Sequence, residues 1–144
     1  MASTIAFMAC GSSKTTSNEK ANVDQAAKYA ASITAKDLGE HLFIYASDAF
    51  EGRETGEPGQ KTAVKYLKDF YVSEGIVSPL GGNDYFQEVP AEWINKNVRR
   101  GEYKDSENVV AFIKGSEKPE EIVVISAHLD HEGIKDGEIY NGAD

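Results

Sequence analysis

The sequence has few of the features that mark a nucleic-acid-binding, disulfide-stabilised or membrane-spanning protein. Its 15 Lys and Arg residues stand against 24 Asp and Glu residues, a formal charge of −9, whereas neutralising phosphates needs a basic surface. The single cysteine cannot form a disulfide within the chain. The longest aliphatic run, residues 122–125, is far shorter than the roughly 18 apolar residues that span a bilayer. We therefore expect a soluble, acidic globular unit with no nucleic-acid partner.

Residues 1–33 differ in composition from the rest of the chain. They are rich in Ala, Ser, Thr, Asn and Lys and contain three basic and two acidic residues, whereas residues 34–144 contain 12 basic and 22 acidic residues. The acidity therefore belongs to the second segment. We predict a leader and tether over 1–33 and a folded part over 34–144.

The leader contains Ile-Ala-Phe-Met-Ala-Cys-Gly-Ser-Ser over residues 5–13. This segment resembles the signal of bacterial lipoproteins, in which an apolar stretch ends in small residues before a cysteine that is lipidated. The resemblance implies lipid attachment at Cys10, and a membrane-anchored or secreted protein of the bacterial cell envelope, periplasmic or in the outer membrane. No Lys or Arg precedes Cys10, unlike in such signals, so an N-terminal extension with an unmodified cysteine is the alternative.

The spacing of apolar residues and the positions of glycine and proline predict helices and strands in residues 34–144. This segment is therefore placed in the α/β class. Apolar residues recur at helical spacing over 34–48, after a capping-box-like start, and over 60–73, before Gly75. The glycine-rich stretch 51–59 predicts a loop, and residues 78–107 read as a longer loop with a turn at 81–84. Strands are predicted over 108–114 and 121–127, the second apolar on both faces as in a central, covered strand.

The segment Ser-Ala-His-Leu-Asp-His-Glu-Gly, residues 126–133, follows this second strand. Ligands of open α/β sheets bind at the carboxyl ends of the strands. His128 and Asp130 are two residues apart, so in an extended chain their side chains point the same way. A metal-ligating histidine needs a partner for its other ring nitrogen, and a carboxylate can fix its tautomer. The pair therefore suits a metal ligand and its orienting group, although a structural hydrogen bond is the alternative.

Several motifs occur together in this order: residues 34–48, Glu-Gly-Arg-Glu-Thr-Gly (51–56), the second helix, residues 108–115, residues 125–133 and Asn-Gly-Ala-Asp (141–144). The combination, from residue 34 onward, resembles zinc aminopeptidases of metallopeptidase family 28, which includes bacterial leucyl aminopeptidases. The resemblance implies the N-terminal part of a three-layer α/β/α mixed-sheet zinc-exopeptidase fold. It also implies a peptide substrate, two zinc ions sharing a water, one of them bound by His128, and support of His128 by Asp130.

The same resemblance implies that the bridging carboxylate, the general base and the other ligands would follow Asp144. A catalytic zinc site ordinarily needs three protein ligands. We therefore expect an N-terminal portion of an aminopeptidase that is inactive by itself. A non-catalytic receptor-type relative and a glutaminyl cyclase on the same scaffold are alternatives. A metallo-β-lactamase-type hydrolase is disfavoured, because Ser126 stands where its first histidine is required.

Three further residues, two histidines and an arginine, have their own expected roles. His131 is expected at the edge of the site or in solvent rather than as a ligand. His41 is expected to be packed and hydrogen-bonded on the first helix. Arg53 is expected to pair with nearby carboxylates and hold the glycine-rich loop, with a substrate-facing role as the alternative.

Overall fold

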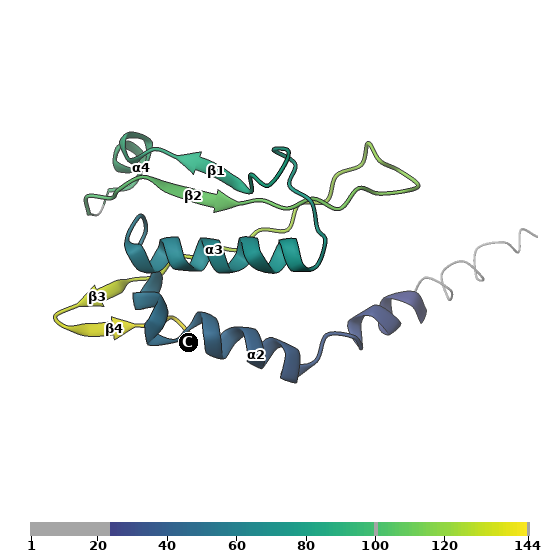
Figure 1. The fold of residues 1–144 in the computed structure, drawn as a ribbon, viewed down its shortest axis with the longest axis horizontal. Coiled ribbons are helices and arrows are strands. Elements are labelled where there is room, and N and C mark those ends of the chain that lie inside the picture. The colour runs from purple at the N-terminus through teal and green to yellow at the C-terminus, as the bar shows by residue number, and fades with distance from the viewer. Residues whose placement is uncertain (1–23, 100, 144) are drawn as a thin grey trace, which may run out of the picture. The chain divides into compact units, whose positions relative to one another are not determined.

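The computed structural model describes residues 24–99 and 101–143 (Figure 1), so Cys10 and Asp144 lie outside the described residues. The chain divides after Glu40 into two units. Helices and small antiparallel sheets occur together, which is compatible with the general α/β class predicted from the sequence. In chain order the elements are α2 (Ala35–Tyr45), the 3₁₀ helix η1 (Asp48–Arg53), α3 (Pro58–Ser73), β1 (Phe86–Val89), α4 (Ala91–Asn97), β2 (Ser106–Val109), β3 (Gly133–Lys135) and β4 (Glu138–Tyr140).

The described part of the first unit begins in a helix that continues to residue 30, within the segment expected to be a tether. Three of its residues over 24–30 are alanine, which has the highest helix propensity of all residues. Residues 24–33 are all exposed. None of the helices within the described ranges is long and apolar enough to cross a membrane.

Both predicted helices are confirmed. α2 begins after Thr34, whose hydroxyl accepts the N–H of Asp37 at 3.2 Å and donates to the Asp37 carboxylate at 2.6 Å. α3 begins two residues before the predicted start, at Pro58. Proline has no backbone N–H, but the N–H groups of the first helical turn have no partner within the helix, so proline is tolerated there. These local signals explain why the sequence pattern located both helices.

Gly75 ends α3, as predicted. Its φ of +68° is costly for other residues. The N–H of Gly75 donates to Val72 O at 3.1 Å, and the N–H of Ile76 donates to Tyr71 O at 2.9 Å. This pair of bonds is a Schellman motif, which satisfies two of the last free carbonyls of the helix.

The prediction of a continuous loop over 78–107 is wrong. β1 pairs with β2 in antiparallel register from Phe86–Val109 to Val89–Ser106, and α4 lies between them in the sequence. Pro90 precedes α4, where its fixed φ suits a helix start. The expected strand over 108–114 is confirmed only in part, because β2 ends at Val109 and one isolated bridge joins Phe112 to Val77.

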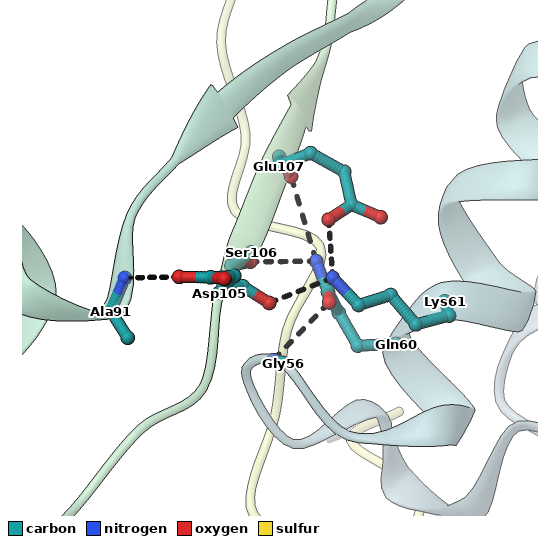
Figure 2. A network of polar contacts seen from close by, with 7 residues as sticks. All are labelled: Gly56, Gln60, Lys61, Ala91, Asp105, Ser106 and Glu107. Carbon is teal, nitrogen blue, oxygen red and sulfur yellow. Dashed lines mark hydrogen bonds and ion pairs between the residues drawn. The ribbon is translucent and has the colours of Figure 1, made fainter.

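A polar network holds α3 against β2 (Figure 2). The buried Gln60 side chain, 1% exposed, accepts the Gly56 N–H at 3.2 Å and donates to Ser106 Oγ at 2.9 Å. Lys61 forms an ion pair with Glu107. The network therefore fixes the end of the glycine-rich loop as well as the strand.

The prediction of a buried central strand over 121–127 is wrong for this structure. The segment is in no helix or strand, and the side chains of residues 122–125 are between 73% and 93% exposed. β-branched residues form strands by packing on neighbouring strands. Among the described residues no strand pairs with this segment, so its β-branched side chains have no neighbouring strand to pack against.

The last two strands form a hairpin whose turn is at Asp136 and Gly137. Both turn residues have positive φ, +53° and +86°, as in the Asp-Gly turns that suit strand twist. β3 and β4 both contact η1, and η1 packs on α3 (Figure 1). The buried apolar residues include Phe50 of η1, Ala63 and Val64 of α3, Tyr85 before β1 and Ile94 of α4.

Candidate functional site

The glycine-rich loop has an unusual backbone where it meets the β3–β4 hairpin. Glu51, Gly52 and Arg53 have successive φ values of +49°, +65° and +54°. Left-handed conformations cost residues other than glycine about 1–2 kcal/mol each, so the surrounding packing has to hold them. A Cβ on Gly52 would lie 2.5 Å from the carbonyl oxygens of both Gly133 and Tyr140. The loop therefore presses its backbone directly against the hairpin.

Arg53 is buried, with 4% of its surface exposed, and its guanidinium joins three segments. Nη1 donates to the carbonyl of Tyr45 at 2.6 Å, Nε to that of Leu129 at 2.9 Å, and Nη2 to that of Gly142 at 3.5 Å. The guanidinium carbon also lies 4.8 Å from the centre of the Tyr45 ring. Within residues 24–99 and 101–143 the guanidinium pairs with no carboxylate, contrary to the expectation. The planar guanidinium instead donates hydrogen bonds to carbonyl oxygens of residues that are far apart in the sequence.

Two further bonds tie the loop to the His-x-Asp segment. The Thr55 hydroxyl donates to Asp130 Oδ2 at 2.6 Å, and the His131 N–H donates to Arg53 O at 3.1 Å. The loop is also joined to β3, because Lys135 Nζ donates to Glu54 Oε1 at 2.6 Å. That hydrogen bond raises the pKa of Lys135. Residues 129–131 are therefore fixed by the loop, although they belong to no regular element.

The structure brings His128 and Asp130 together. His128 Nδ1 lies 2.9 Å from the main-chain oxygen of Asp130 and 3.4 Å from its carboxylate Oδ1. The His128 side chain is 82% exposed and the Asp130 side chain 42% exposed. Because Nδ1 faces two acceptors, this geometry favours the neutral tautomer with the proton on Nδ1, in which Nε2 keeps its lone pair. His128 can therefore offer Nε2 as a ligand.

His131 is half-buried, and a Cβ on Gly142 would lie 2.6 Å from its ring. Gly142 has a φ of +61°, so a glycine is needed there for both conformation and space. The neighbouring Asn141 donates to Asp48 Oδ1 at 2.7 Å. The Asn-Gly-Ala segment thus lies beside the His-x-Asp segment, with Arg53 bonded to both.

His41 lies apart from this site, and it is hydrogen-bonded as expected, but the expectation of a packed residue is wrong because the residue is exposed. Its Nδ1 lies 2.8 Å from the Tyr66 hydroxyl, and its ring meets the Phe70 ring edge to face at 4.9 Å. Within the described residues, no group of three or more His, Cys, Asp or Glu side chains is arranged to hold a metal. Of the predicted site residues, the structure therefore describes His128 and Asp130 and joins them to the glycine-rich loop.

Comparison with family models, with curated proteins and with solved structures found no match for this chain.

Sequence reasoning did not assign Thr55 or Tyr45 to the site. Thr55 is 75 positions away from Asp130 in the sequence, so no local pattern joins them. The one signal was the set of three glycines over 51–59, since glycines often mark places where backbones approach closely. Tyr45 belongs to α2, where its apolar spacing indicated packing alone.

Tyr45 should make stability depend on pH in the alkaline range. Burial raises its pKa to about 12, with Arg53 acting in the opposite direction. The folded state holds this proton more tightly than the unfolded state, so the contribution is complete below about pH 10 and is lost as pH rises through about 12. Wild type should lose up to about 1.4 kcal/mol per pH unit more than Tyr45→Phe in this window.

Urea unfolding at several pH values between about 9 and 12 measures this difference. Tyr29→Phe is a matched control, because Tyr29 is 66% exposed. Its curve should follow that of wild type. Parallel curves for wild type and Tyr45→Phe would contradict the assignment.

Proposed function

We propose that the chain is the N-terminal part of a zinc-dependent aminopeptidase of metallopeptidase family 28, which removes N-terminal residues from peptides. The complete domain would have the three-layer α/β/α fold of zinc exopeptidases. The observation that most supports the proposal is the His128 geometry: Nδ1 faces Asp130 and the exposed ring leaves Nε2 available. This is the arrangement that a metal-ligating histidine requires.

The described residues suit one position of a zinc site. His128 would supply an imidazole nitrogen, which zinc accepts readily, and Asp130 would hold the ring orientation. Bound zinc activates water and polarises the scissile carbonyl. Thr55 and Arg53 contribute by fixing residues 129–131.

The proposal includes the cell envelope as the location, with lipid attachment at Cys10. The physical support is the sequence of residues 5–13, in which an apolar stretch ends in small residues before the cysteine. A polar linker after a lipid anchor gives an enzyme room to stand away from the membrane.

Hydrolysis of an aminoacyl p-nitroanilide tests the function. Protein purified from its own reading frame in the presence of zinc should hydrolyse leucyl p-nitroanilide. His128→Ala should reduce kcat/KM by about 100-fold or more, because it removes a metal ligand. His41→Ala is the control, since it removes a histidine that lies outside the site. Equal activity of His128→Ala and wild type would reject the proposal.

A further inference from the structure

The geometry points to Thr55 as a positioning residue for His128, acting through the carboxylate of Asp130. The inference rests on the proposed function, in which His128 Nε2 binds zinc. It extends that function to a residue of the glycine-rich loop, and thus to the way in which the ligand is kept in its binding form.

Thr55 controls one of the two carboxylate oxygens. Its hydroxyl donates to Asp130 Oδ2 at 2.6 Å, while Oδ1 lies 3.4 Å from His128 Nδ1. The Asp130 side chain is 42% exposed, so without a partner it could turn toward water. A hydrogen bond to a charged group is stronger than one between neutral groups. The Thr55 hydroxyl therefore keeps Oδ1 directed at the imidazole.

The position of Thr55 is itself fixed on both sides. Arg53 is buried and bonded to three carbonyls, two residues before it. Gly56 follows it, and the Gly56 N–H donates to the buried Gln60 side chain at 3.2 Å. A Cβ on Gly56 would lie 2.8 Å from the backbone oxygen of Lys104. A hydroxyl held this rigidly can select one orientation of a carboxylate.

The consequence for His128 is a choice of tautomer. With Oδ1 and the Asp130 main-chain oxygen both near Nδ1, the Nδ1–H form of the neutral ring is favoured. Nε2 is then a lone-pair donor, which is the form that binds a metal. If Oδ1 turned away, the stabilisation of the Nδ1–H form would decrease and more of the ring would have its proton on Nε2. Thr55 would thus raise the fraction of His128 that is ready to bind zinc.

The test is the ¹⁵N chemical shifts of the His128 ring in the 144-residue chain without metal. They report the ratio of the Nδ1–H and Nε2–H tautomers at about pH 8.5, where imidazole side chains are neutral. His128→Gln assigns the signals. Thr55→Val should lower the Nδ1–H to Nε2–H ratio at least about twofold. Thr55→Ser keeps the hydroxyl and should restore the wild-type ratio, which a purely structural role of the methyl group would not.

Thr62→Val is the matched control, because it deletes a threonine hydroxyl that donates to Pro58 O within α3, away from the site. Should Thr55→Val fail to fold by circular dichroism, Thr55→Ala deletes the same hydroxyl with a smaller side chain. A ratio in the folded hydroxyl-deletion variant equal to that of Thr62→Val would overturn the inference. This readout needs no zinc, so its failure is distinct from failure of the proposed activity, which the His128→Ala kinetics report.

Discussion

Replacing Arg53 by alanine should lower the free energy of unfolding by about 3 kcal/mol or more. The side chain is 4% exposed and donates to the carbonyls of Tyr45, Leu129 and Gly142. Its loss removes three bonds from a charged donor and leaves part-buried carbonyl oxygens without this partner. It also removes the guanidinium that stabilises the left-handed backbone at 51–53. Urea unfolding followed by far-ultraviolet circular dichroism measures the effect.

Two further variants show whether the loss of stability comes from the guanidinium of Arg53. Arg99→Ala removes an exposed arginine and should change stability by less than about 0.5 kcal/mol. Arg53→Lys keeps the charge but lacks the planar fork, so it should retain only a minor part of the stabilisation. An Arg53→Ala variant as stable as Arg99→Ala would show that the loop does not depend on the guanidinium.

Gly52→Ala should cost about 3 kcal/mol or more, because the added methyl group meets two backbone oxygens. The Cβ would lie 2.5 Å from Gly133 O and Tyr140 O. Both belong to strands of the hairpin, so relief requires the loop and hairpin to separate. The amide signals of Gly133 and Tyr140 in an NMR spectrum should shift, since the contact involves their own backbone.

Gly75→Ala is a closely matched control for this substitution. Gly75 has a φ of +68° against +65° for Gly52, but nothing lies within 4 Å of the position that an added methyl group would take there. It therefore has the same conformational strain, about 1–2 kcal/mol, without the collision. Equal losses of stability for the two variants would show that the approach of the loop to the hairpin is looser than the structure indicates.

The parts of the fold that could be predicted are those determined by nearby residues. The apolar spacing of α3 and Gly75 at its end are local, and they located the helix within two residues. The Asp136-Gly137 turn is equally local. β1 and α4 could not be predicted in the same way, because four and seven residues are too few to show a clear period.

Strand formation over 121–127 depends on a partner. The apolar residues favour the interior of a sheet, but they form a strand only when another segment pairs with them. In the described residues that segment remains exposed. The prediction of a covered central strand over 121–127 is therefore wrong in both strand formation and burial.

In the candidate site too, the contact between nearby residues was predicted and the contacts with distant residues were not. The spacing of His128 and Asp130 was enough to expect the two side chains on one side, and they lie 3.4 Å apart at Nδ1 and Oδ1. The partners of this pair come from the loop, 75 positions away in the case of Thr55. No local pattern in the sequence indicates such contacts. Arg53 is an example: its charge suggested carboxylate partners, but its guanidinium donates to backbone carbonyl oxygens.

The zinc content of protein purified from its own reading frame tests most directly the proposal that His128 is a zinc ligand of an aminopeptidase. After dialysis against metal-free buffer, wild type should retain about two zinc ions per molecule. His128→Ala should lose at least one of them, and His41→Ala should lose none. A wild-type protein without zinc, or a His128→Ala variant that retains the full amount, would contradict the account.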